Sequence, residues 1–153
     1  MATAISTMKL LGDHDFIAYD HDPGATTAII TSPDGGTTKR VMLLTGLSGF
    51  GCIVKPTIVG GAGISLVEII AADDAAMSVN VVQVKSSGAI VHDSLDDHTI
   101  LECSAEEIST LSQTALYAAV RITMATNTDE ASVVYIGISP RFRYSGLSAS
   151  LQN

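Results

Sequence analysis

Alternation between apolar and other residues along most of the chain is the feature that most limits its fold. From Leu116 to Met124 every second residue is apolar, and the residues between them are mixed. Successive side chains of a β-strand point to opposite faces, so the pattern predicts a strand with one face on a core. Its other face then meets solvent or a neighbouring subunit. A polar turn at residues 127–130 leads into a second alternating run at 132–139, which predicts that the two runs form a hairpin.

A second hairpin is predicted nearer the N-terminus. Residues 27–31 and 40–44 flank the segment SPDGG, in which proline presets φ and the glycines permit a positive φ. The same signals predict further strands at residues 16–20, 51–59, 64–71, 78–85, 89–92 and 99–103. Many short strands separated by turn signals are typical of an all-β sandwich or barrel.

One segment departs from the period of two. Ser104 and Glu107 form a capping-box pattern, in which the serine hydroxyl accepts from the third helical N–H and the glutamate reaches back. Ile108 and Leu111 then lie on one side of a single short helix, which we expect near residues 105–112.

The length and composition predict one folded domain. The chain has 153 residues, of which 46% are hydrophobic and 16% are charged. We place the β-sandwich domain at residues 12–144, after an N-terminal arm (1–11) and before an uncharged C-terminal tail (145–153). The beginning of the chain lacks the pattern of a secretory signal, and the longest uncharged stretch is too short and glycine-rich to cross a bilayer. We therefore expect a soluble protein made in a cytoplasm, with no membrane partner.

Charge and aromatic content restrict the partners. The formal net charge is −8, which argues against a nucleic-acid partner because phosphate neutralisation needs clustered Lys and Arg. The chain has no Trp and few other aromatic residues that could line a ligand pocket, so we expect no cofactor.

Each histidine of the chain has an aspartate beside it, which makes His14, His21, His92 and His98 candidate metal ligands. In an extended segment, however, adjacent side chains point to opposite faces, so one Asp-His-Asp triplet cannot offer all its ligands to one ion. No HExxH, CxxC or EF-hand spacing is present either. Asp and His residues in capped turns are the favoured interpretation, and a metal site is the alternative.

No sequence motif predicts catalysis. Ser48 does not lie in a GxSxG pattern, and neither GxG run opens a helix that could hold a phosphate. Cys52 and Cys103 each lie in an apolar stretch, which favours buried free thiols over the one disulfide that they could form. We therefore expect a protein that is not an enzyme.

Two arginines and two aromatic residues alternate after the last predicted strand, at Arg141, Phe142, Arg143 and Tyr144. These residue types are favoured at protein interfaces, so the four are candidate interface residues. The alternative is a simple strand exit with solvated arginines.

The stretch from Ser104 to Tyr144 resembles the closing half of jelly-roll domains in tailed-bacteriophage virion proteins. The resemblance is carried by a short helix (EEISTL), a long alternating strand (LYAAVRITMAT), an acidic turn (NTDE) and a last strand ending in Arg and aromatic residues (VYIGISPRFRY). It implies an antiparallel jelly-roll sandwich and a capsid-associated role, as a head decoration or cement protein or as a fibre or spike module, usually in trimers. Pro140 departs from the simpler ending of this pattern and leaves the path of the tail open.

The leading hypothesis is a non-enzymatic decoration protein on the capsid surface of a virion. It would self-associate, with a trimer favoured by the resemblance, and would bind the major capsid protein. One alternative is a carbohydrate- or receptor-binding β-sandwich of a fibre or spike. Another is a small metal-dependent enzyme that uses the Asp/His loops.

Overall fold

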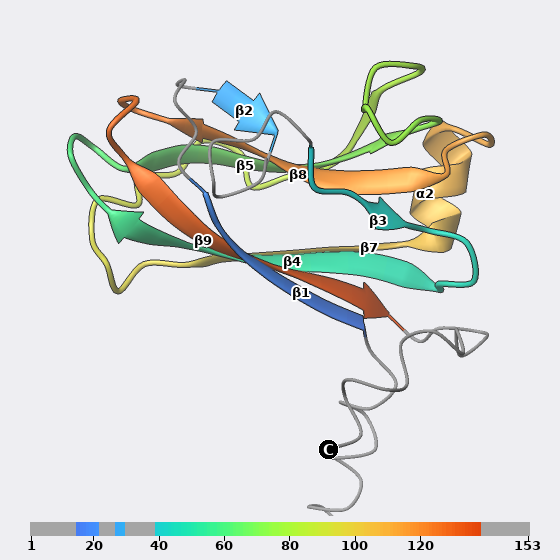
Figure 1. Ribbon diagram of the computed structural model, residues 1–153, viewed down its shortest axis with the longest axis horizontal. Helices are drawn as coiled ribbons and strands as arrows, with labels where there is room; N and C mark the ends of the chain where they lie inside the picture. The colour runs from blue at the N-terminus through green and yellow to red at the C-terminus, as the bar shows by residue number, and fades with distance from the viewer. Residues whose placement is uncertain (1–14, 22–26, 30–38, 139–153) are drawn as a thin grey trace, which may run out of the picture.

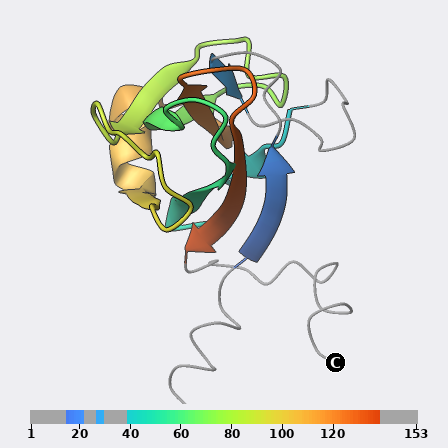
Figure 2. The ribbon, with the colours of Figure 1, turned by 90° about the vertical axis from the view of Figure 1, so that its left-hand side faces the viewer.

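The computed structural model describes residues 15–21, 27–29 and 39–138, and these residues form two facing antiparallel sheets and one short helix (Figure 1). The helix is α2 (Ala105–Leu111). The strands are β1 (Asp15–His21), β2 (Thr27–Ile29), β3 (Met42–Leu43), β4 (Gly49–Ile58), β5 (Ile64–Ala72), β6 (Val82–Ser86), β7 (Thr99–Ser104), β8 (Tyr117–Met124) and β9 (Glu130–Ile138). Seen end-on, the two sheets enclose the core between them (Figure 2).

The strand order is that of a jelly roll. The first sheet has the order β1-β9-β4-β7 and the second has the order β2-β8-β5-β6, with β3 also paired to β8. The chain therefore pairs like one long hairpin wrapped around a core: β1 with β9, β2 and β3 with β8, β4 with β7, and β5 with β6. The prediction of an all-β antiparallel sandwich is confirmed.

Both predicted hairpins are wrong, although their strands exist. The strands predicted at 116–124 and 132–139 are β8 and β9, but β8 belongs to the second sheet and β9 to the first. Their turn therefore crosses between the sheets instead of joining two paired strands. Turn residues indicate where the chain reverses, but they do not indicate which strand pairs with the strand that follows.

The other predicted hairpin is one interrupted edge strand. β2 and β3 both pair with β8: Ile29 lies opposite Arg121, and Met42 lies opposite Ala118. Residues 30–41 separate these two segments, whereas only two residues of β8 separate their partners. β2 and β3 thus pair with successive parts of the same edge of β8 and not with each other.

Two further strand predictions, both for the chain between β5 and β7, need correction. The strand expected at 78–85 begins only at Val82, because Asp74 accepts hydrogen bonds at 2.8 Å from the N–H groups of Ser78 and Val79 and holds a turn there. The strand expected at 89–92 is reduced to an isolated bridge between His92 and Ile64.

Tyr135 connects the two sheets inside the core. It projects from β9 of the first sheet, is fully buried, and packs edge-on against Phe50 with ring centroids 5.3 Å apart. Its hydroxyl accepts a hydrogen bond from the Val120 N–H (2.9 Å) and donates one to the Arg40 carbonyl (3.1 Å). Val120 belongs to β8 and lies at the interruption between β2 and β3. The phenol thus lies between the Val120 N–H and the Arg40 carbonyl and links them.

The capping box is confirmed. Ser104 accepts from the Glu107 N–H at 3.1 Å, and the Glu107 carboxylate accepts from the Ser104 N–H at 2.8 Å. The resulting helix, α2, buries Ile108 and lies at one end of the sandwich, against β4, β6 and β7 (Figure 1). In the described part of the chain no helix has the length and apolar character needed to span a membrane.

Asp129 holds together two turns at one end of the sandwich. It is fully buried. One carboxylate oxygen accepts from the N–H groups of Gly60 and Gly61 at 2.8 and 2.9 Å, in the β4–β5 turn. The other accepts from the N–H and hydroxyl of Thr126, in the β8–β9 turn, at 2.9 and 3.0 Å. Burial acts to raise the pKa of Asp129, but these hydrogen bonds outweigh it and lower the pKa below its usual value.

Replacing Tyr135 by Phe should destabilise the protein by about 1–3 kcal/mol, because the buried Val120 N–H then has no acceptor in the core. The measurement is urea unfolding followed by circular dichroism. Tyr117→Phe is the matched control, since the Tyr117 hydroxyl makes no hydrogen bond to a described residue. Equal unfolding midpoints for the two variants would contradict the bridging role of Tyr135.

Replacing Asp129 by Asn should cost about 2–3 kcal/mol at pH 7, because an amide cannot accept from all four donors. The lowered pKa adds a pH dependence. Stabilisation by this carboxylate is present above the unfolded-state pKa of about 4 and is lost as the pH falls through the lower folded-state pKa. The wild-type free energy of unfolding should therefore fall as the pH drops below about 4, and this fall should be smaller in the variant. Asp96→Asn, an exposed turn residue, should unfold like the wild type throughout.

Candidate interaction surface

The candidate metal ligands do not converge in the described part of the chain. His92 lies within 2.6 Å (Nε2) of the Thr99 hydroxyl and pairs through its backbone with Ile64, whereas His98 is exposed in the turn before β7. His14 lies outside the described residues, and His21 is described only as a backbone position in β1. Among the described side chains, no three His, Cys, Asp or Glu residues form a group that could hold a metal ion.

The candidate interface residues Arg141, Phe142, Arg143 and Tyr144 follow the last described residue, Ile138. They lie outside the described residues, as do the predicted arm and tail, so these assignments stay predictions.

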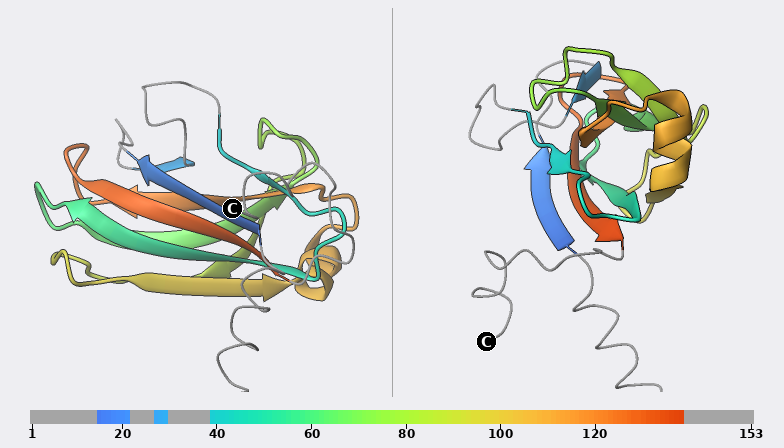
Figure 3. Two further views of the ribbon diagram at one scale, coloured as in Figure 1. Left: turned by 60° about the horizontal axis from the view of Figure 1, so that its bottom comes forward. Right: turned by 90° about the vertical axis from the view of Figure 1, so that its right-hand side faces the viewer.

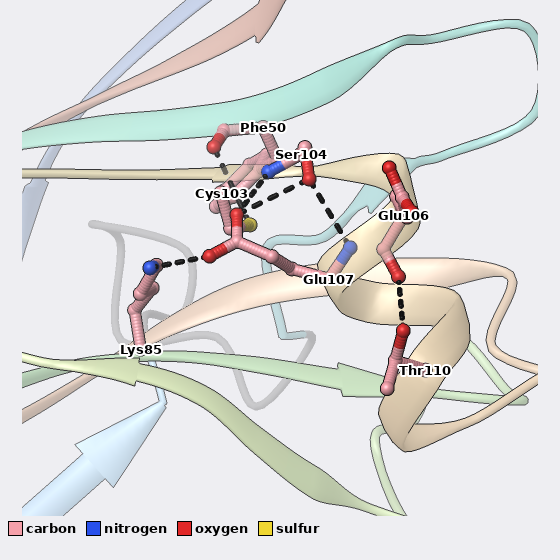
Figure 4. Close-up of polar contacts among 7 residues, drawn as sticks. All are labelled: Phe50, Lys85, Cys103, Ser104, Glu106, Glu107 and Thr110. Atoms are coloured by element: carbon pink, nitrogen blue, oxygen red, sulfur yellow. Dashed lines mark hydrogen bonds and ion pairs between the residues drawn. The ribbon is translucent and has the colours of Figure 1, made fainter.

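One cluster combines a thiol, an amine and a carboxylate, the groups that nucleophilic catalysis uses. Figure 4 shows Lys85 of β6 paired with Glu107 of α2, beside Cys103 of β7. The Cys103 thiol is 3% exposed and lies 3.5 Å from the Phe50 carbonyl, to which it donates. The cluster ties α2 to the edges of both sheets.

The electrostatics of this cluster do not activate the thiol. Burial raises the pKa of Cys103 to about 11, and the negative charge of Glu107 acts in the same direction. The hydrogen bond and charge of Lys85 lower the pKa of Glu107 to about 2, and Glu107 in turn raises the pKa of Lys85. The amine and carboxylate therefore stay charged and satisfy each other, and the thiol keeps its proton. A thiolate is the reactive form of cysteine, so this arrangement is structural.

A second candidate is an open pocket of about 230 Å³ between α2 and the β3–β4 connection. Its described walls are aliphatic, with hydroxyl and amide groups between them, and none carries a charge. The lining residues are Leu44, Thr45, Leu47, Gly49, Ala105, Ile108, Ser109, Ser112, Gln113, Ala115 and Leu116. Such a pocket offers no described acid, base or metal ligand for a reaction.

The third candidate is the outer face of the first sheet. Figure 3 (left) turns this sheet toward the viewer, with β7, β4, β9 and β1 side by side. Residues that lie opposite each other on neighbouring strands form rows across this face. One row is Val134–Ile53–Ile100, and the next contains Ile136 opposite Gly51. We call five described aliphatic residues of this surface the apolar face: Ile53, Ile100, Val134, Ile136 and Ile138.

The apolar face is open to solvent. Ile100 is 61% exposed, and the other four side chains are partly exposed. On the opposite side of the sandwich, the outer face of the second sheet is covered by the chain itself. There Met77, 4% exposed and held in a left-handed turn, packs over Ile70 and Ala119. Contiguous exposed apolar surface marks sites of protein association.

Two charged side chains flank the row Val134–Ile53–Ile100 on this face. Lys55 follows Ile53 on β4, and Glu102 lies on β7 opposite Gly51. Both side chains are exposed, and neither forms an ion pair with another described residue.

The sequence of β9 itself carries a signal for this surface. In β9, Val133 and Tyr135 face the core, but the residues that alternate with them, Val134 and Ile136, are apolar too. An antiparallel strand that faces water on one side normally alternates apolar with polar residues. A strand that is apolar on both faces therefore indicates that its outer face meets something other than water.

No protein-family model matches the chain, and the search of curated proteins found no match.

Both thiols should be unreactive in the folded protein. Burial raises the pKa of Cys52 to about 12 and that of Cys103 to about 11, so the native chain should react with a colorimetric disulfide reagent at pH 8 only as it unfolds. In denaturant two thiols per chain should react, because both cysteines are free. Fast stoichiometric labelling of the native protein would contradict the structural assignment.

Proposed function

We propose that the chain is a non-enzymatic structural protein of a virion, which decorates a shell, self-associates and stabilises that shell. The observation that carries the proposal is the apolar face on the outside of the first sheet. A sandwich that acts alone needs no such surface, whereas a subunit of an assembly buries it against a neighbour.

The chemistry of the described side chains supports a packing role over a catalytic one. The amine and carboxylate nearest to a thiol neutralise each other, and the thiol keeps its proton because it is buried. The pocket beside α2 has uncharged walls. The strand order adds support, because the resemblance of residues 104–144 to phage virion domains implies a jelly roll and the described strands have that order.

The mechanism follows from mass action. A protein that binds only the assembled shell stabilises it by about 2.7 kcal/mol per site when its free concentration is a hundred times the dissociation constant. Self-association increases this effect, because two linked contacts on one lattice hold more tightly than either contact alone. No reaction step is needed.

Shells of the parent virus, assembled without this chain, should bind the purified protein to a fixed number of copies per shell. The bound protein should raise the melting temperature of the shell by several degrees, because it must dissociate before the shell comes apart. Co-sedimentation measures the binding, and scanning calorimetry measures the melting temperature.

Matched variants separate the apolar face from general surface effects. Ile100→Lys should reduce the amount bound, because it places a charge on the most exposed side chain of the apolar face. Val91→Lys should bind like the wild type, since Val91 is 71% exposed but lies away from this face. Wild-type protein that never sediments with shells, or equal losses in the two variants, would contradict the proposal.

A further inference from the structure

We infer that two copies of this chain pack face to face through the apolar face, related by a two-fold axis that runs along the row Val134–Ile53–Ile100. This inference rests on the proposed function and specifies the partner for that surface: a second copy. It differs from the three-fold association that the resemblance implies.

Strand geometry places the two charges on opposite sides of this row. Along β4, Lys55 lies two residues beyond Ile53, and Gly51 lies two residues before it, which is about 7 Å in each direction. Glu102 is opposite Gly51 on the neighbouring strand, about 5 Å to the side. Lys55 and Glu102 of one chain are therefore too far apart to pair with each other.

A two-fold axis along the row brings these charges together between copies. The rotation places Lys55 of one copy above Gly51 of the other, beside Glu102, and symmetry forms the same contact a second time. Gly51 has no side chain, so the aliphatic stem of Lys55 can lie over it while the ammonium group reaches the carboxylate. The face is thus complementary to itself in charge, as an isologous contact requires.

The alternative axis is disfavoured by the same charges. Two sheets that pack face to face keep their strand directions within about 30° of each other, so a two-fold axis in the contact plane runs either across the strands or along them. An axis along β4 through Ile53 would place Lys55 over Lys55, and like charges at an interface are repulsive. Of these two axes, only the one across the strands brings Lys55 of one copy beside Glu102 of the other.

The size of the face predicts a weak dimer. Four strands spaced about 5 Å apart and about 25 Å long give roughly 500 Å² per copy. The total of about 1,000 Å² is at the lower limit for a specific interface. The association should therefore depend on protein concentration over the micromolar range, with the shell lattice supplying the remaining contacts.

The test is sedimentation-equilibrium centrifugation of the full chain at low ionic strength, with charge-reversed variants. The wild type should be a dimer at high concentration. Lys55→Glu alone, or Glu102→Lys alone, should raise the dimer dissociation constant about tenfold or more, because each variant creates two like-charge contacts. The control is Glu106→Lys on α2, outside the face. It makes the same charge change as Glu102→Lys and should leave the dimer unchanged.

Combining the two charge reversals, in one chain or by mixing the two variants, gives the decisive result. The double variant K55E/E102K should recover wild-type affinity, and an equimolar mixture of K55E with E102K should form heterodimers, because both of their charge pairs are then of opposite sign. Failure of the mixture to associate, insensitivity to charge reversal, or a wild-type trimer would overturn the inference. A wild-type monomer that still saturates shells would overturn it, together with self-association, and leave the proposed binding to the shell standing. A charge-dependent dimer that never binds shells would support this inference and contradict the proposed function.

Discussion

The hydroxyl of Tyr135 joins the two sheets inside the core. β8 is paired along one side with two short segments, β2 and β3, and Val120 of β8 lies between their pairing partners. A phenol from β9, in the opposite sheet, accepts the hydrogen bond of Val120 on β8. Because a buried N–H without an acceptor is costly, this hydrogen bond across the core stabilises the sandwich at Val120. Packing against Phe50 fixes the ring that delivers this acceptor.

Local features of the fold could be predicted from the sequence, and pairing could not. The capping box at Ser104 and Glu107 depends on residues three positions apart, so its prediction needed no knowledge of the remaining chain. The strands β8 and β9 followed from alternation in the same way. Their assignment to different sheets did not, because a turn signal is the same whether the chain returns beside itself or crosses over the core. In a jelly roll most pairings are between strands distant in sequence, and adjacency along the chain misleads.

The candidate surface was predictable only in part, for a related reason. Apolar residues on both faces of β9 indicate that its outer face is covered, and this signal lies within one strand. The row that joins Ile53 to Ile100 depends on the pairing of β4 with β7, which brings together residues nearly fifty positions apart. The same pairing sets the positions of Lys55 and Glu102. Cysteine burial, in contrast, was predicted from the apolar character of the adjacent residues and is confirmed.

The pairing of β1 with β9 has a mechanical consequence. Asp15 lies opposite Gly137, so the described fold begins and ends at the same corner of the first sheet. In antiparallel strands the ladder hydrogen bonds run perpendicular to the strand direction. A force that pulls the two ends of this fold apart would therefore load the ladder one bond pair at a time, like a zipper opened from its end, instead of shearing all the pairs together. A chain tethered through both ends would yield at low tension, whereas load spread over the broad side of the sheet would be shared by all its strands.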